Sequence, residues 1–320
     1  MPELPEVETI VRGLAPVLIG RRLEGVWTSG KALRLARAVD ARGLRAVVEG
    51  ARVRDVRRVG KYITLILDDG SSSSTRRRSS AAATGGGQGG RRGAVDGLSR
   101  QPPLAAPGGP PSSIDDTRGV CVHLGMTGRL RVQRADEPRA PHTHVVFTLD
   151  RNEELRFADA RRFGFVAPGD PLAALPALAV LGPDPLRDLD GGALARAMTG
   201  VRAPLKAFLL DQKRIAGIGN IYACEAMFLA RLHPRLPTHR ARGRAEALLA
   251  AIRETLEGGI ARRGTTLRDY VDADGFAGDN AGALQVYGRE GEPCVVCGRA
   301  VRRQIDAARS TFFCAHCQKR

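Results

Sequence analysis

Four of the six cysteines in this chain stand in a pattern that few folds can accommodate. Two residues separate Cys294 from Cys297 and Cys314 from Cys317, and 16 residues lie between the two pairs. Each pair suits a tight knuckle that aims two sulfurs at one metal, and the stretch between them is long enough for a hairpin. The spacing predicts one structural Zn²⁺ with four thiolate ligands, the alternative being four unrelated free cysteines. Four protein ligands leave no open position for a substrate, and we expect no organic cofactor.

The charge balance indicates a polyanionic partner. Lys and Arg number 50 against 34 acidic residues, which gives a net charge of +16. A solvated basic surface is the plainer explanation, and composition alone does not choose between DNA, RNA and an anionic membrane. Because the chain starts with an acidic segment and has no run of 18 apolar residues, we expect a cytoplasmic protein that neither enters a membrane nor is secreted.

Residues 1–170 have the pattern of a β-rich domain that begins with one helix. Pro5 suits the first turn of this helix, Gly20 a stop, and Pro16 a distorted last turn. The apolar face of the helix consists of Val7, Ile10, Val11, Leu14 and Leu18. Strand patterns run from about 23 to 68 and resume at 120–124 and 145–149.

A low-complexity insert interrupts this domain at residues 71–118, where 23 of 48 residues are Ser, Gly or Pro. Its few large apolar residues cannot offset the entropy of ordering, so we expect it to be disordered. It carries a net charge of +4, so about +12 remains for the rest of the chain. The basic character therefore does not come from the insert.

Residues 171–288 are predicted to be helical, and residues 289–320 to form a separate small module. The strongest helical pattern covers 245–260. The segment from Gly217 to Asn220 precedes another helix, at 221–230. It is either a capped helical turn, with Asn220 as the cap, or a glycine-rich hairpin whose N–H groups hold a phosphate.

Several short motifs resemble those of the formamidopyrimidine-DNA glycosylases, and they occur in that family's order. The motifs are Pro2-Glu3-Leu4-Pro5-Glu6, Gly60-Lys61-Tyr62, His123-Leu124-Gly125-Met126-Thr127-Gly128, Arg161-Arg162-Phe163-Gly164, Gly217-Ile218-Gly219-Asn220-Ile221-Tyr222 and the four-cysteine tail. The resemblance covers the chain apart from the insert. Two departures are the insert itself and Ala160, where the family usually has proline.

This resemblance implies an α+β multidomain fold. Its parts are an N-terminal β-sandwich with a flanking helix, a helix–two-turn–helix domain and a C-terminal zinc finger. It also implies a monomer that binds double-stranded DNA containing an oxidised base in the cleft between the domains. Such a protein would be associated with the bacterial nucleoid.

The resemblance implies a catalytic group made of Pro2, Glu3, Glu6, Lys61 and Arg309. Pro2, freed by removal of Met1, would attack the sugar C1′, because an α-amine with a pKa near 8 has an appreciable neutral fraction at pH 7. Glu3 would protonate the opening sugar and Glu6 would support it, although acids at a helix start are also ordinary dipole partners. Lys61 would assist β-elimination and Arg309 δ-elimination. Each residue also has an alternative without a catalytic role. Pro2 would then be part of a disordered terminus, Lys61 would lie in a solvated turn, and Arg309 would be one more arginine of the basic surface.

The remaining candidates would contact DNA. Met126, Arg161 and Phe163 resemble residues that enter the duplex when a damaged nucleotide is flipped out, although Met126 and Phe163 read alone are ordinary core residues. His142, Arg202 and Asn220 resemble phosphate contacts.

The resemblance therefore implies a base-excision repair enzyme that removes oxidised purines, 8-oxoguanine and formamidopyrimidines, and then cleaves the abasic site by β,δ-elimination. Leu4 favours this activity over the related endonuclease-eight type, which acts on oxidised pyrimidines and typically has glycine at that position. A non-catalytic zinc-ribbon DNA-binding protein is the other alternative. The presence of Pro2 and Glu3, the expected nucleophile and acid, disfavours it. Lesion preference would depend on the loop at about 270–280.

Overall fold

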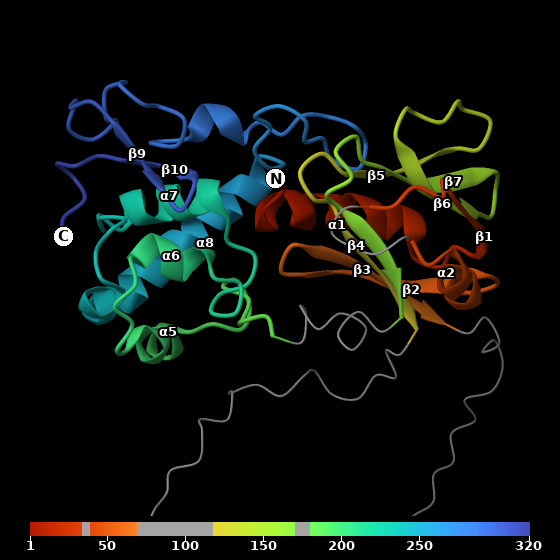
Figure 1. The fold of residues 1–320 in the computed structure, drawn as a ribbon, viewed down its shortest axis with the longest axis horizontal. Helices are drawn as coiled ribbons and strands as arrows, with labels where there is room; N and C mark the ends of the chain where they lie inside the picture. Colours follow the sequence, from red (N-terminus) through yellow and green to blue (C-terminus); the bar gives the residue numbers. More distant parts are fainter. Residues whose placement is uncertain (34–38, 69–117, 170–179) are drawn as a thin grey trace, which may run out of the picture.

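The computed structural model describes residues 1–33, 39–68, 118–169 and 180–320. Figure 1 shows two lobes side by side, one built mainly from β-sheets and the other from helices with a small hairpin. Helix α1 (Leu4–Leu18) begins at the junction of the lobes and runs along the β-sheet lobe. Within the described ranges, no helix combines the length and apolar character needed to cross a membrane.

The N-terminal lobe contains two four-stranded antiparallel sheets, as the predicted β-sandwich requires. One sheet has the order β1 (Leu23–Thr28), β6 (Thr143–Leu149), β7 (Glu153–Ala158), β5 (Arg129–Arg134). The other has the order β2 (Arg52–Val59), β3 (Tyr62–Asp68), β4 (Gly119–His123), β8 (Phe165–Pro168). Apolar side chains from both sheets share one buried cluster, so the two sheets pack face to face.

Helix α1 closes this core with its apolar face. Val7, Ile10 and Leu14 are buried in the cluster that contains both sheets, as their spacing predicts. The helix continues through Pro16 to Leu18 and gives way to Gly20, whose φ of +84° favours glycine. The predicted helix and its end are thereby confirmed.

One prediction for this lobe is wrong, because the stretch 23–68 is not made of strands alone. Helix α2 (Ala41–Val48) lies between β1 and β2. Its start is fixed by Asp40, whose side chain accepts a hydrogen bond from Gly43 N–H at 2.8 Å. Leu44 and Val48, one helical turn apart, are buried in the sandwich core. Only these two of its eight residues are fully buried, which is too short a pattern to reveal this helix in the sequence.

The predicted disordered insert at 71–118 lies outside the described residues except for its last member. Arg118 is described, and its Nε donates a hydrogen bond to the carbonyl of Val47 at 2.7 Å. The described residues on either side of this stretch are neighbours, because the N–H of Leu67 donates to the carbonyl of Arg118 at 3.0 Å. The predicted domain boundary at residues 170–171 also lies outside the described residues.

The second lobe is helical, with a small hairpin. Its helices are α5 (Gly191–Met198), α6 (Leu205–Leu210), α7 (Asn220–Leu229), η1 (Thr238–Arg244), α8 (Ala245–Ala261) and η2 (Asn280–Ala283). The hairpin consists of β9 (Arg302–Asp306) and β10 (Arg309–Phe313). Helix α8 confirms the strongest helical prediction. Leu4, in the first turn of α1, is buried in this lobe's core and so ties the two lobes together.

Candidate active site

The start of α1 and the start of α7 meet head to head where the lobes join. Both oxygens of Glu3 accept backbone hydrogen bonds there, Oε1 from Ile221 at 3.0 Å and Oε2 from Tyr222 at 3.3 Å. Gly219, which is the N-cap of α7, gives the carboxylate its room, since a Cβ there would lie 2.1 Å from the carboxyl carbon of Glu3. The predicted cap Asn220 is instead the first helical residue.

The sequence left open whether the N–H groups at the start of α7 hold a phosphate. The N-terminus of α7 is already occupied, but by the carboxyl group of the protein's own Glu3. The N–H groups of Ile221 and Tyr222 are therefore already used. The glycine-rich segment holds a carboxylate at the lobe junction rather than offering these two donors to a phosphate.

Glu6 lies one turn further along α1 and is enclosed by donors from both lobes. Its Oε2 accepts from the N–H of Glu3 at 2.7 Å, and its Oε1 accepts from the Tyr222 hydroxyl at 2.6 Å and from Thr265 N–H at 2.7 Å. Burial, followed by the charge of Glu3, raises the pKa of Glu6 from its ordinary 4.5 to about 7. The carboxyl can therefore carry or release a proton near neutral pH.

Lys61 is buried beside this pair and does not lie in a solvated turn. Only 8% of its surface is exposed, and its Nζ donates to the carbonyl of Ile218 at 2.8 Å. Burial lowers the pKa of Lys61; the negative charge of Glu3 opposes this shift and the positive charge of Arg309 adds to it. The same electrostatic neighbourhood thus contains four of the five predicted catalytic residues.

A cavity of about 320 Å³ opens next to these groups. Pro2 and Glu6 line it, and so do Met126 and Arg161 from the N-terminal lobe. Pro2 is buried rather than part of a loose terminus. The wall that the helical lobe supplies comes mainly from Thr265, Leu267, Arg268, Asp269 and Tyr270.

Two loops of the N-terminal lobe carry the predicted base-flipping residues, and Asp159 joins them. Its buried carboxylate accepts from the hydroxyl of Thr127 in one loop and from the N–H of Gly164, at 2.8 Å, in the other. The loops touch at glycines, because a Cβ at Gly125 would lie 2.4 Å from the nitrogen of Gly164. Asp159 therefore fixes both loops as one unit.

The side chains on these loops are not core residues. Met126 is 37% exposed, and Phe163 is half-buried. The guanidinium carbon of Arg161 lies 4.7 Å from the centre of the Phe163 ring, within the range of a cation–π interaction. An arginine and two apolar side chains therefore lie together at the edge of the cavity.

His142 and Arg202 lie apart from this group. Both are exposed, and neither lines the cavity. His142 has a φ of 63°, and its carbonyl accepts from Asp159 N–H at 2.9 Å, so its backbone is attached to the loop junction. Their positions are compatible with contacts to a ligand that extends beyond the cavity.

The hairpin β9–β10 is held against the start of α7 by buried polar contacts. The carbonyl of Ser310 accepts from Asn220 Nδ2 at 2.9 Å and from Lys206 Nζ at 3.1 Å, and Lys206 also donates to Thr311 Oγ1 at 2.6 Å. Arg309 begins β10 next to these contacts, which explains how its charge reaches Lys61.

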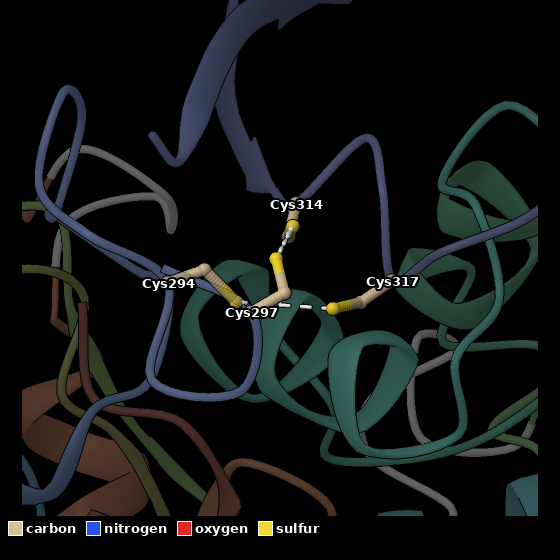
Figure 2. A group of neighbouring side chains, drawn as sticks. All are labelled: Cys294, Cys297, Cys314 and Cys317. Carbon is tan, nitrogen blue, oxygen red and sulfur yellow. Dashed lines mark hydrogen bonds between the residues drawn. The ribbon is translucent and has the colours of Figure 1, made fainter. Parts of the chain in front are cut away.

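The four predicted zinc ligands come together at the base of this hairpin (Figure 2). All four sulfurs lie within 4.8 Å of one another, and the Sγ distances are 3.9 Å for Cys294–Cys317 and 3.5 Å for Cys297–Cys314. Tetrahedral coordination with Zn–S bonds of about 2.3 Å separates sulfurs by about 3.8 Å. The cluster fits one structural zinc ion, whose absence would leave the hairpin without its central cross-link.

The roles of three residues in this site could not be recognised in the sequence. In the sequence, Asp159 looks like a surface acid near two arginines. Tyr222 looks like an aromatic residue on one face of a helix, and Thr265 like an ordinary residue that follows a helix. Each has a partner on a distant segment, which is Glu6 for Tyr222 and Thr265 and Thr127 for Asp159, so local patterns carry no signal for these contacts.

Family models match three consecutive parts of the chain. The model of the formamidopyrimidine-DNA glycosylase N-terminal domain matches residues 1–87 and 106–166. The model of the H2TH domain of the same glycosylase matches residues 181–271, and a zinc finger found in FPG and IleRS matches residues 291–320.

Individual relatives match over their whole length. The formamidopyrimidine-DNA glycosylase of Sphingopyxis alaskensis is 39% identical over 323 residues, covering 100% of each chain. A crystal structure of the MutM (Fpg) protein from Thermus thermophilus is 34% identical, with a TM-score of 0.75, and covers 99% of this chain and 98% of its own. A complex of wild-type Lactococcus lactis Fpg with DNA containing N7-benzyl-Fapy-dG is 26% identical, with a TM-score of 0.76 and full coverage of both chains.

Proposed function

Because this chain belongs to the formamidopyrimidine-DNA glycosylase family, we propose that it excises oxidised purines from duplex DNA and then cleaves the abasic site. The observation that carries the proposal is the cavity at the lobe junction. Pro2, the candidate nucleophile, lines it together with Met126 and Arg161, the candidate base-flipping residues. Damaged double-stranded DNA is the partner, and the net charge of +16 suits it.

Pro2 begins the reaction once Met1 has been removed. Its secondary amine attacks C1′, the damaged base leaves, and the resulting iminium ion acts as an electron sink. Loss of a proton from C2′ then drives β-elimination of the 3′ phosphate, and δ-elimination releases the 5′ phosphate. The burial of Pro2 in the cavity wall supports this role, since a group that attacks sugar must be held in place.

Glu3 protonates the opening sugar ring, and Glu6 supports it. Glu3 is held from both sides, through the N–H groups of α7 and through its own N–H, which donates to Glu6. A Glu6 pKa of about 7 allows this second carboxyl to hold a proton at neutral pH. The two carboxyls therefore lie beside Pro2 as a proton donor to the sugar and a second group that can hold a proton.

Lys61 and Arg309 provide positive charge on the side of the phosphates. Lys61 assists the β-elimination and Arg309 the δ-elimination. Burial lowers the pKa of Lys61 and the charge of Arg309 lowers it further, so an anion placed near both side chains would be stabilised by them. The zinc-bound hairpin supports this arrangement because it holds Arg309 against the helical lobe through Asn220 and Lys206.

Met126, Arg161 and Phe163 fill the gap that the flipped nucleotide leaves. Unstacking a base costs a few kcal/mol, and inserted side chains offset part of that cost. The shared anchor Asp159 supports this role, because a preorganised wedge loses little entropy on insertion. His142, Arg202 and Asn220 contact phosphates outside the cavity.

We also infer the division of the chain and its setting in the cell. Residues 1–170 are the catalytic domain, 171–288 the helix–two-turn–helix domain and 289–320 the zinc finger. The protein acts as a monomer, since one chain contains every proposed catalytic group. Its substrate places it at the bacterial nucleoid.

The test is a cleavage assay on two duplexes, one with 8-oxoguanine opposite cytosine and one with an oxidised pyrimidine. We expect release of 8-oxoguanine and a nicked strand with phosphate at both ends, with the pyrimidine lesion processed more slowly. Preference for the pyrimidine lesion would favour the endonuclease-eight type of activity. Tight binding without cleavage of either duplex would favour a non-catalytic DNA-binding protein.

A further inference from the structure

Residues 270–276 follow helix α8 of the helical lobe in the chain but pack against the N-terminal lobe. Tyr270 and Ala273 are buried in the same hydrophobic cluster as the apolar face of α1. The contact with α1 is close, since a Cβ at Gly13 would lie 2.8 Å from the Cβ of Ala273. We call residues 270–276 the docked loop.

The docked loop is closed on itself by Asp272. The buried carboxylate of Asp272 accepts from the N–H of Phe276 at 2.8 Å and from that of Asp274 at 3.1 Å. Its N–H in turn donates to the carbonyl of Phe276 at 2.9 Å. A loop with these internal bonds moves as a unit, so a bond to any part of it positions the whole.

Arg131, on strand β5 of the N-terminal lobe, holds this unit in place. Its Nη2 donates to the backbone carbonyl of Asp274 at 2.8 Å. Gly275 permits this approach, because a Cβ there would lie 2.7 Å from the guanidinium carbon of Arg131, and its φ of +95° favours glycine. Arg129, two residues earlier on the same strand, donates to the carbonyl of Asp269 at 3.3 Å.

The segment just before the docked loop forms a wall of the cavity. Leu267, Arg268 and Asp269 line the space that Pro2 also lines, and Tyr270 belongs to both the wall and the docked loop. The position of this wall is thus set by the N-terminal lobe, through Arg131, and not only by the helices that precede it in the chain.

We propose that Arg131 is a positioning residue for base excision, which fixes the cavity wall at 267–270 against an everted base by holding the docked loop. The inference rests on the proposed function, and it adds that Arg131 affects two substrates, a damaged base and an abasic site, differently. A damaged base occupies the cavity during excision, whereas an abasic site brings no base to be held. Arg131 therefore matters for removal of the base and not for cleavage at an existing abasic site.

The experiment compares two duplexes of one sequence, with 8-oxoguanine opposite cytosine or with an abasic site at the same position. Arg131→Met removes the donor while keeping the apolar stem. We expect it to lower single-turnover excision by about tenfold, the effect of one lost hydrogen bond to a charged donor. Cleavage of the abasic duplex should stay within about threefold of wild type, a change too small for a lost hydrogen bond of that kind.

Three further variants make the result specific. Arg134→Met is the matched control, because Arg134 lies on the same strand and its side chain binds Asp136 at the surface; both rates should match wild type. Arg131→Lys keeps a donor for the Asp274 carbonyl and should recover part of the excision rate. Gly275→Ala would place a methyl group against the Arg131 guanidinium, and so should also slow excision of 8-oxoguanine but not cleavage of the abasic duplex.

The following results would overturn the inference. Equal losses on both duplexes, or a fall in melting temperature that accounts for the loss, would make Arg131 a purely structural residue. Unchanged excision by Arg131→Met, with an active wild type, would show that the wall is positioned without it. A wild-type protein inactive on both duplexes would instead refute the proposed function, and this inference with it.

Discussion

The buried carboxyl of Glu6 makes the stability of the N-terminal lobe depend on pH in a direction opposite to that of most acids. Its pKa is about 7 in the folded protein and about 4.5 in the unfolded chain. Between these values the folded state binds more protons than the unfolded state, so stability falls as pH rises through this window. A pKa difference of about 2.5 corresponds to a loss of about 3 kcal/mol in the free energy of unfolding across this pH window.

Glu6→Gln removes this ionisation and keeps the shape of the side chain. We expect the variant to gain about 3 kcal/mol of unfolding free energy relative to wild type between about pH 4 and about pH 8. The lost hydrogen bond from the N–H of Glu3 adds a penalty that does not depend on pH and leaves the slope unchanged. Urea unfolding followed by Trp27 fluorescence is the assay, because the single tryptophan of the chain lies on β1 of this lobe.

A control of opposite sign is available in the same lobe. Burial alone would raise the pKa of Glu154, but hydrogen bonds and charge from Arg139 and Arg156 hold it below the ordinary value. Its contribution is present above the unfolded pKa and lost as pH falls, so Glu154→Gln should lose stability relative to wild type as pH rises. A free-energy difference between Glu6→Gln and wild type that is flat across the pH range would refute the assignment of a protonated Glu6.

Three other predictions follow from the site. Cys314→Ser should release the zinc, measured by elemental analysis, and weaken DNA binding while the N-terminal lobe stays folded; an active protein that contains no zinc would contradict this. Phe163→Ala should slow 8-oxoguanine excision more than it weakens binding to undamaged DNA, with a smaller penalty on abasic DNA. The melting temperature must be followed as a control, because truncating an aromatic costs about 3–5 kcal/mol of stability where the ring is fully buried, and Phe163 is half-buried. Replacing residues 71–117 by a short turn should leave excision within about an order of magnitude, since the flanking strands β3 and β4 already pair; a variant that does not fold would show that the segment is structural.

The sequence predicted those parts of the molecule whose signals are local. The apolar face of α1 repeats at helical spacing, and the four cysteines are two close pairs, so both could be inferred from short stretches. The order of the motifs predicted the family, which the comparisons confirm. The cysteine cluster likewise bears out the predicted zinc site.

The parts that could not be predicted depend on contacts between distant segments. Glu3 caps a helix 218 residues away, and nothing near Glu3 in the sequence announces that partner. Asp159 joins two loops by accepting hydrogen bonds from a backbone N–H and a hydroxyl. An acidic residue just before two arginines does not by itself indicate this role. Helix α2 could not be predicted because packing against the sandwich core, through Leu44, Val48 and the partly buried Val47, stabilises so short a helix more than its own propensity does.

The most direct test of the central claim is to map the covalent intermediate of the proposed lyase reaction. Wild-type protein is incubated with the 8-oxoguanine duplex and borohydride, and the trapped adduct is digested and located by mass spectrometry. The account predicts an adduct on the N-terminal peptide through Pro2, and no trapping by Pro2→Gly or by protein with an N-terminal extension, both of which should still bind DNA. An adduct on Lys61 or any other lysine would contradict the mechanism.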